Sequence, residues 1–264
     1  MVEEYDIPIP PLPEQKRIVK VLDEVFEGVN KAKANAEKNL DNAKELFESY
    51  LQGVFGTTNG HESTRTKQEW ETKKLEDILQ KTETVNPTLC PDKEFLYIDV
   101  SSVDNQTFSV KNATLLKGKD APSRARKLVK SGDVIFATVR PTLKRIAIIP
   151  KEYNGQVCST GYFVLRGKEL INNNLLFYFL QTNRFNEKMQ KLQKGASYPA
   201  VTDSDVKEQI VTFPKSMSEQ RAIVAKLDAL SEQIKKLEAI YQQKLAGLEE
   251  LKKSVLKKAF SGDL

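Results

Sequence analysis

The sequence predicts an α+β protein: one mixed α/β globular domain flanked by two long α-helices that form an antiparallel coiled coil. Three observations lead to this fold class. A helical segment occurs twice, each copy carries an apolar seam, and the stretch between them holds short β-branched and aromatic runs. Residues 14–55 align without a gap with residues 219–260, and 15 of the 42 aligned pairs are identical. A helical segment duplicated around a different middle indicates two spacer helices with a separate domain between them.

The chain divides into five parts on this pattern. They are, in order, a proline-rich lead-in at 1–13 with a strand-like stretch at Tyr5–Ile9, the first spacer helix at 14–56, a polar linker at 57–68, the globular domain at 69–214 and the second spacer helix at 215–264. Prolines precede each helix and glycines follow it. These are typical helix boundaries, because proline cannot continue a helix and glycine readily adopts the conformation that ends one.

Both repeats carry the 4-3 spacing of apolar residues that forms one stripe along a helix. The positions are Ile223, Leu227, Leu230, Ile234, Leu237 and Tyr241 in the second repeat, and Ile18, Leu22, Val25, Val29, Ala32 and Ala36 in the first. In each repeat the spacing then slips, to Leu245 and Leu40, and resumes through Leu251 in the second. A slip at equivalent places indicates two helices that stay in step with each other. Forty residues at about 1.5 Å each give a rod of roughly 60 Å.

The middle of the chain alternates between predicted strands and helices. The candidate strands are Phe95–Val100, Val134–Val139, Ile146–Ile149, Phe163–Arg166 and Ile210–Phe213. The candidate helices are Leu75–Lys81 and an amphipathic run at Asn174–Gln193, whose apolar positions fit a buried stripe. About 145 residues are enough for one self-sufficient core.

Composition excludes several classes of function. With 39% hydrophobic and 29% charged residues and only short apolar runs, the sequence predicts a soluble chain without a membrane span. Cys90 and Cys158 are isolated, which favours a reduced, cytoplasmic setting. The one histidine, His61, lies in the linker, so the sequence offers no metal cluster and no Ser/His or Cys/His couple. No Gly-rich cofactor loop is present either, so neither a catalytic residue nor a cofactor of its own is predicted.

Positive charge is concentrated in the predicted globular domain. Residues 65–214 contain 24 Lys and Arg against 17 Asp and Glu, whereas the rest of the chain contains 17 against 19. Within the domain, nine basic residues fall between 117 and 145, and only Asp120 and Asp133 offset them. Phosphate binding needs such a cluster, because each cation placed at a phosphate releases condensed counterions. The alternative is an ordinary solvated surface.

Ten residues are candidates for nucleic-acid contact. They are Arg124, Arg126, Lys127, Arg140, Thr142, Lys144, Arg145, Lys194, Ser197 and Tyr198. The group around Arg140 directly follows a predicted strand. The group around Arg124 lies in a predicted turn, and loops on a rigid scaffold commonly carry contacts. The last three belong to the run Lys194–Pro199, a flexible loop with a hydroxyl and a stacking ring. The alternative for that run is a plain turn before the final strand.

Four features of the sequence resemble the DNA-specificity subunit of type I restriction–modification systems. They are Ile7–Val19 with its proline-rich, Glu-Gln start; the return of that start at 213–228; Trp70 with Leu75–Ile78 and Tyr97–Val100; and Gly132–Phe136 with Gly195–Val201. Their order and spacing across nearly the whole chain are specific. The resemblance implies that the globular part is a target recognition domain and that the two helices are conserved spacers.

The resemblance also implies a function. The recognition domain would read one half-site of double-stranded DNA. The helices would act as a ruler and as a docking surface for methyltransferase (modification) subunits, which bring S-adenosylmethionine, and a restriction subunit would join through the complex. A full specificity subunit is expected to carry two recognition domains, whereas this sequence holds one, so it resembles a truncated or half-length form. Whether the helices pair within one chain or exchange between two copies in a homodimer stays open.

Two other functions stay open from the sequence. The first is a stand-alone DNA-cleaving enzyme, for which Glu69, Glu71 and Lys73 offer an acid-x-Lys fragment that is common by chance in a charged chain. The second is a coiled-coil scaffold protein that does not bind DNA. Salt-dependent retention on duplex DNA separates DNA recognition from the scaffold. Cleavage that depends on Mg²⁺ separates it from the enzyme.

Overall fold

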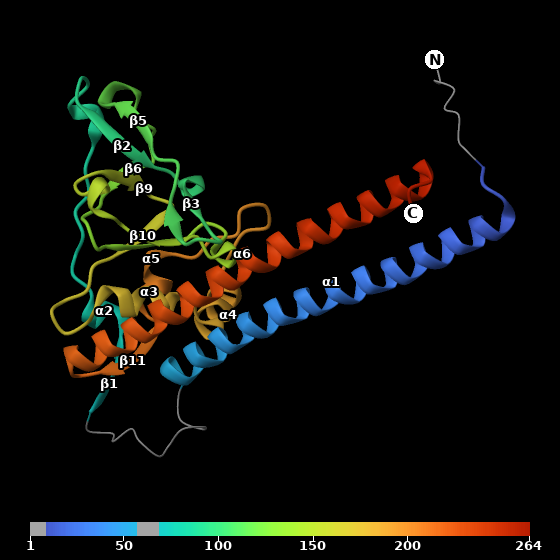
Figure 1. Cartoon of the computed structure of the whole chain (residues 1–264). Coiled ribbons are helices and arrows are strands. Elements are labelled where there is room, and N and C mark those ends of the chain that lie inside the picture. The colour runs from blue at the N-terminus through green and yellow to red at the C-terminus, as the bar shows by residue number, and fades with distance from the viewer. Residues whose placement is uncertain (1–8, 57–68) are drawn as a thin grey trace. The chain divides into compact units, whose positions relative to one another are not determined.

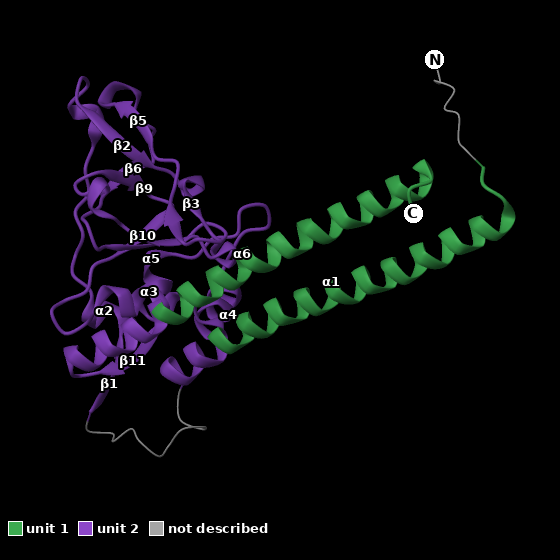
Figure 2. Ribbon diagram, in the orientation of Figure 1, with its two compact units in different colours: residues 1–47, 229–264 green, residues 48–228 purple. Residues whose placement is uncertain are grey.

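The computed structural model describes residues 9–56 and 69–264, and the chain falls into two compact units. One unit takes in Met1–Phe47 and Ala229–Leu264, and the other takes in Glu48–Asp228 (Figure 2). The unit boundaries cut the two long helices, so the last turns of the first helix and the first turns of the second belong to the globular unit. No helix among the described residues is long and apolar enough to cross a membrane.

Two predicted segments fall wholly or largely outside the described residues. The polar linker at 57–68, with His61, is one of them. The strand-like stretch Tyr5–Ile9 is the other; only Ile9 is described, and it lies outside any helix or strand.

The first unit contains most of two antiparallel helices, α1 (Leu12–Phe55) and α6 (Met217–Ser261), drawn in blue and red in Figure 1. Two ion pairs join them: Lys33 Nζ lies 3.3 Å from Glu249 Oε1, and Lys44 Nζ lies 3.3 Å from Glu238 Oε1. In the repeat alignment Lys33 corresponds to Glu238, and Lys44 corresponds to Glu249. The two ion pairs are therefore one contact made twice with the charges exchanged. The duplicated sequence folds as a pseudo-two-fold helix pair, which confirms the antiparallel prediction.

The seam between these helices differs from the predicted one in its details. Leu237 and Leu251 are 37% and 48% exposed, whereas their neighbours Glu238 and Lys252 are partly buried. The partly buried positions run through Ile234, Glu238, Tyr241, Leu245, Leu248, Lys252 and Val255, a regular 4-3 spacing. The predicted slip at Leu245 is therefore wrong. Lys252 places its ammonium 5.2 Å from the ring centroid of Phe26. Long charged side chains can bury their stems in a seam and keep their charges accessible, which a count of apolar residues misses.

Engineered cysteines test the register of the pair. Val29→Cys with Lys252→Cys is expected to form a disulfide readily, because the ion pairs bring these parts of the two helices together. The matched control is Val29→Cys with Ile234→Cys, because Ile234 is the repeat counterpart of Val29 and would meet it only in a parallel pair. In the antiparallel pair those two positions are separated by about 28 Å along the axis. Faster crosslinking of the control pair on a non-reducing gel, in a Cys90→Ser background, would contradict the register.

The second unit contains eleven short strands and four helices besides the ends of α1 and α6 within the described chain. The strands are β1 (Trp70–Lys74), β2 (Glu94–Ile98), β3 (Val103–Asp104), β4 (Ser109–Val110), β5 (Thr114–Lys117), β6 (Ala125–Leu128), β7 (Val134–Ala137), β8 (Ile146–Ile148), β9 (Val157–Ser159), β10 (Tyr162–Leu165) and β11 (Ile210–Pro214). The helices are α2 (Leu75–Ile78), α3 (Asn173–Gln181), α4 (Asn183–Leu192) and α5 (Asp203–Lys207). All five predicted strands are present with small shifts in their bounds.

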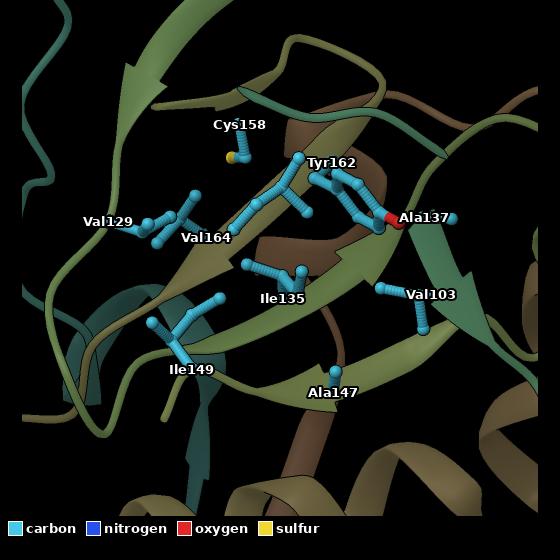
Figure 3. Close-up of a cluster of buried hydrophobic side chains, with 10 residues drawn as sticks. Val103, Val129, Ile135, Ala137, Ala147, Ile149, Cys158, Tyr162 and Val164 are labelled. Carbon is cyan, nitrogen blue, oxygen red and sulfur yellow. The ribbon is translucent and has the colours of Figure 1, made fainter. Parts of the chain in front are cut away.

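The strands form four small sheets among the described residues. The orders are β5-β2-β9-β6 and β10-β7-β8, with β1-β11 and β3-β4 as separate two-stranded pairs. β7 and β10 are buried along their whole lengths, which is why their sequences read as continuous apolar runs. Figure 3 shows side chains of these two strands packed with Val129, Ile149 and Cys158. This core supports the segment that directly follows β7.

The predicted helix Asn174–Gln193 is two helices, α3 and α4, with a break at Thr182. Thr182 is 1% exposed and its backbone is extended, with φ −60° and ψ 143°. Its hydroxyl donates to the carbonyl oxygen of Phe179 at 2.8 Å and accepts from the backbone N–H of Phe185 at 3.2 Å. A threonine that bonds the end of one helix and the start of the next competes with continuous helix. The apolar periodicity runs across the break, so it does not reveal the break.

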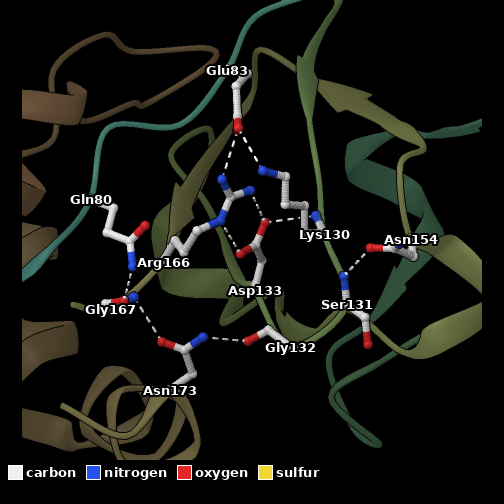
Figure 4. Close-up of polar contacts among 10 residues, drawn as sticks. All are labelled: Gln80, Glu83, Lys130, Ser131, Gly132, Asp133, Asn154, Arg166, Gly167 and Asn173. Carbon is white, nitrogen blue, oxygen red and sulfur yellow. Dashed lines mark hydrogen bonds and ion pairs between the residues drawn. The ribbon is translucent and has the colours of Figure 1, made fainter. Parts of the chain in front are cut away.

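A buried ion pair ties β10 to the turn before β7. Arg166 donates from Nε to Asp133 Oδ1 at 2.8 Å and from Nη2 to Asp133 Oδ2 at 2.7 Å (Figure 4). The Asp133 side chain is 2% exposed, and it also accepts from the backbone N–H of Lys130 at 2.7 Å. On its exposed side Arg166 meets Glu83, which also pairs with Lys130 at 2.6 Å. The Asp133 carboxylate therefore fixes the chain direction that leads into β7.

The domain-side ends of the long helices are buried within the second unit. Leu51 is fully buried, and the ring of Phe55 packs on that of Phe179 at 5.7 Å between centroids. Gln220 is fully buried: its amide donates to the carbonyls of Leu170 at 2.9 Å and Pro214 at 2.7 Å, and its carbonyl accepts from the N–H of Asn172 at 2.8 Å. About two turns further along α6, Asp228 accepts a hydrogen bond from the hydroxyl of Tyr178 at 2.5 Å. These contacts lie inside the second unit and hold the end of α1 and the start of α6 within it.

Candidate nucleic-acid interface

The segment that follows β7 turns sharply and exposes a basic group. Thr138 is buried, and both its N–H and its hydroxyl donate to the carbonyl of Gly161, at 2.8 and 3.0 Å. Arg140 then adopts the left-handed conformation with φ 49°, and Lys144 does so again with φ 50°. The short 3-10 helix Pro141–Leu143 lies between them. Residues other than glycine rarely adopt positive φ, and such strain clusters at functional sites.

A second loop lies against this turn. The N–H of Arg140 donates to the carbonyl of Pro199 at 2.7 Å, and its guanidinium carbon lies 4.9 Å from the ring centroid of Tyr198. Lys194 and Ala200 form a bridge that closes the loop, and the loop begins at Gly195 with φ 99°. Tyr198 is 71% exposed. A ring and a cation presented together offer a stacking surface and hydrogen-bond donors in one place.

The structure brings together five of the ten predicted contact residues, which we term the Arg140 surface. They are Arg140, Thr142, Lys194, Ser197 and Tyr198, and all five are exposed. They come from two segments more than 50 residues apart. The Arg140 Nη2 group also lies 3.4 Å from the carbonyl of Ser197, which links the two segments a second time.

Three other predicted residues have their charges tied to the protein. Lys127 Nζ donates to the carbonyl of Tyr162 at 2.6 Å and to Asp203 Oδ2 at 2.8 Å, and its side chain is 15% exposed. Arg145 Nη1 donates to the carbonyl of Val100 at 2.7 Å. Lys144, the third, has its ammonium near Asn183 and Glu48. A cation already paired inside the fold is a weaker candidate for phosphate contact than an exposed one.

The remaining two predicted residues lie near β6. The sequence suggests a turn across Ala121–Arg126, but Ala125–Leu128 is a strand, paired with β9 at the edge of its sheet. An edge position tolerates the polar residues that made the segment read as a turn. Arg126 is half-buried and donates to the carbonyl of Ala125 at 2.8 Å. Arg124 is exposed, and its carbonyl accepts from the N–H of Thr160, whose neighbour Gly161 bonds Thr138. Its backbone is thereby close to the turn that follows β7.

A basic stripe on α4 was not among the predicted contacts. Arg184, Lys188 and Lys191 are exposed and spaced four and three residues apart, opposite the buried Phe185 and Met189. That spacing places them on one helix face. The start of α4 adjoins the turn that follows β7, because Asn183 Oδ1 lies 3.3 Å from the ammonium of Lys144. The 4-3 basic spacing was visible in the sequence and could have identified them.

The described residues contain no group of three or more His, Cys, Asp or Glu side chains placed to hold a metal ion. The side chains of the Arg140 surface are cations, hydroxyls and an exposed ring, which are suited to binding a ligand.

The comparisons with known proteins agree on one family. The family described as "Type I restriction modification DNA specificity domain" matches residues 1–39 and 67–245. The MjaVIII specificity subunit of Methanocaldococcus jannaschii is 23% identical, over 99% of this chain and 63% of that protein. The EcoKI specificity subunit of Escherichia coli is 25% identical, over 98% of this chain and 58% of that protein. The chain thus spans about three fifths of the length of these relatives.

Solved structures give the same answer. The HsdS subunit from Thermoanaerobacter tengcongensis is 37% identical with a TM-score of 0.61, over 68% of this chain and 46% of that chain. A second structure, described as the structural basis of complex assembly and conformational transition of the type I R-M system, is 36% identical with a TM-score of 0.68. It covers 73% of this chain and 50% of that one. On the family match, which spans more than half of its length, this chain belongs to the type I restriction–modification DNA specificity family.

Proposed function

We propose that this chain recognises duplex DNA as the non-catalytic specificity subunit of a type I restriction–modification complex. The observation that carries this function is the Arg140 surface, an exposed cation–aromatic pair held in a strained turn of the globular unit. Exposed cations such as Lys194 would fix the domain on the phosphate backbone, while a few side chains read base edges in the major groove. The resemblance to specificity subunits supplies the kind of DNA and the kind of complex.

Arg140 is the proposed base reader. An arginine that donates two hydrogen bonds to guanine is the commonest specific contact in the major groove. Stacking on Tyr198 restricts the guanidinium before DNA arrives, so less conformational entropy is lost on binding. Arg124 and the α4 stripe would follow the backbone on either side, because they are exposed and adjoin the same turn.

The long helices are the proposed docking surface for modification subunits, as in the family. Those subunits would supply S-adenosylmethionine and the methyl transfer, and a restriction subunit would join through them. This chain would contribute the choice of sequence and the separation between half-sites.

A second recognition domain is the proposed occupant of the N-terminal half of α1. In α6, the domain covers Gln220, Val224 and Leu227, and Tyr178 bonds Asp228. The repeat counterparts in α1 are the identical residues Gln15, Val19, Leu22 and Asp23. Val19 is 54% exposed where Val224 is 6% exposed. Identical residues in identical register, more buried in one repeat than in the other, support a second domain of the same kind at this part of α1.

Base reading and phosphate contact are separable by mutation. Arg140→Ala is expected to weaken binding to the sequence that the chain selects from a random duplex library by about 1–3 kcal/mol, with a smaller loss on random DNA. Lys117→Ala, an exposed cation on β5, is expected to weaken binding to both DNAs equally and to flatten the dependence on salt. The measurement is fluorescence anisotropy with both duplexes. Small, equal losses from the two variants would remove Arg140 as the base reader.

A further inference from the structure

A carboxylate from the end of α1 lies beside the turn that carries Arg140. Glu48 Oε1 is 3.8 Å from Lys144 Nζ, and the side chains are 32% and 28% exposed. The other carboxylate oxygen, Oε2, is buried and has no hydrogen-bond partner within the described parts of the chain. Burial raises the pKa of Glu48, and the ammonium of Lys144 opposes that rise. Among the described residues, Lys144 is the cation whose charge offsets the cost of placing this carboxylate in the fold.

Lys144 is held in place from several sides. Its backbone is left-handed, and its N–H donates to the carbonyl of Pro141 at 3.0 Å. Its ammonium has Asn183 Oδ1 at 3.3 Å as a second partner. To contact a DNA phosphate, the ammonium would have to move away from Glu48. The carboxylate would then lose its ion pair, and its Oε2 atom already lacks a hydrogen-bond partner among the described residues. Removing the partner of a partly buried charge is costly, because the remaining charge is left uncompensated.

We propose that Glu48 is a positioning residue that keeps the ammonium of Lys144 off the DNA backbone. The domain then contacts one phosphate fewer than its basic residues would allow, and a larger share of its affinity comes from base contacts. Such a restraint favours specificity, since a phosphate contact adds the same affinity to every DNA sequence. This inference rests on the proposed function.

The repeat supports a role tied to the recognition domain. Around Glu48 the two helices keep identical residues: Ser49, Leu51 and Phe55 match Ser254, Leu256 and Phe260. Position 48 itself differs between the two repeats, because the counterpart of Glu48 is Lys253. The acid is therefore present at the helix end that packs on this domain and is replaced by a base in the other repeat.

The test is Glu48→Gln in the full chain, which keeps the shape of the side chain and removes its charge. Binding to a random-sequence duplex is expected to strengthen about two- to fivefold, and the slope of log K against log salt to steepen by about 0.9, the value for one added phosphate contact. Lys144→Met alone is expected to leave the slope unchanged, and Glu48→Gln in the Lys144→Met background is expected to have no effect. Preference for the selected sequence over random DNA is expected to fall in Glu48→Gln.

Glu45→Gln is the matched control, because Glu45 is an exposed glutamate one turn away on the same helix. It removes the same charge without releasing Lys144, so its slope should equal that of the unmodified chain. Equal effects of the two glutamate variants, or a Glu48→Gln effect that survives Lys144→Met, would overturn the inference. A lowered slope in Lys144→Met alone would overturn it too, since Lys144 would already contact a phosphate. If the unmodified chain binds no duplex, the proposed function fails and this inference falls with it. Circular dichroism and thermal unfolding check that each variant is folded.

Discussion

Replacing Asp133 with alanine is expected to lower the free energy of unfolding by about 3–5 kcal/mol, because it leaves a largely buried arginine without its main partner. Both carboxylate oxygens of Asp133 receive hydrogen bonds from Arg166, at 2.8 and 2.7 Å, in the bidentate geometry that is strongest for this pair. The Asp133 side chain is 2% exposed and that of Arg166 is 11% exposed. The variant also removes the acceptor for the N–H of Lys130. Urea unfolding followed by circular dichroism measures the loss.

Glu83→Gln is the control, because Glu83 meets the same arginine from the exposed side. Its side chain is 46% exposed, so water screens the pair and the loss at neutral pH should be much smaller. Hydrogen bonds from Lys130 and Arg166 lower the pKa of Glu83 from its usual 4.5 to about 2. Because the folded pKa is below the unfolded one, this contribution is present above the usual pKa and disappears as the pH falls toward 2. A loss from Glu83→Gln as large as that from Asp133→Ala would show that burial does not set the strength of this network.

The overall architecture was predictable because the helical segment is repeated in the sequence. The repeat gave the two long helices, and the apolar pattern between the copies gave the principal strands. The helix seam was less predictable, since Glu238 and Lys252 occupy seam positions through their side-chain stems, and patterns of apolar residues pass over them. The break at Thr182 was hidden for a related reason. Apolar periodicity continued through it, and the hydrogen bonds of one hydroxyl decided the backbone.

The candidate site was predictable as a set of residues but not as a surface. Arg140 and Tyr198 were both chosen from the sequence, yet their contact depends on a bridge between Val139 and Ala200 that no local pattern indicates. The left-handed backbone at Arg140 was equally hidden, because glycine is the usual sign of such a turn. Lys127 is the opposite case. Its charge suggested phosphate contact, but its strand directs the ammonium to Asp203 and a backbone carbonyl.

Together with its modification subunit, this chain is expected to direct adenine methylation to a defined DNA sequence, and the chain alone is expected to methylate and cleave nothing. The choice of adenine follows from the family resemblance. One recognition domain supplies one half-site, so two copies related by a two-fold axis are expected to read an inverted repeat, as symmetric dimers of DNA readers do. Sequencing methylated positions in a strain that carries both proteins measures the target. An asymmetric target with two unrelated halves would show that a different recognition domain supplies the second half-site. No methylation dependent on this chain would remove the proposed function.

The helix pair is expected to set the gap between the half-sites. Deleting Asn35–Asp41 from α1 and Ile240–Ala246 from α6 removes repeat counterparts from the centre of both helices, so the ion pairs Lys33–Glu249 and Lys44–Glu238 can still form. The rod shortens by about 10 Å, which corresponds to about three base pairs of duplex at roughly 3.4 Å each. The methylated sequence should keep both half-sites unchanged, because the Arg140 surface is untouched, and should lose about that many base pairs from the gap. Deleting either segment alone is the control: it shifts the register of the pair and should abolish methylation. An unchanged gap in the double deletion would show that something other than the two helices sets the separation.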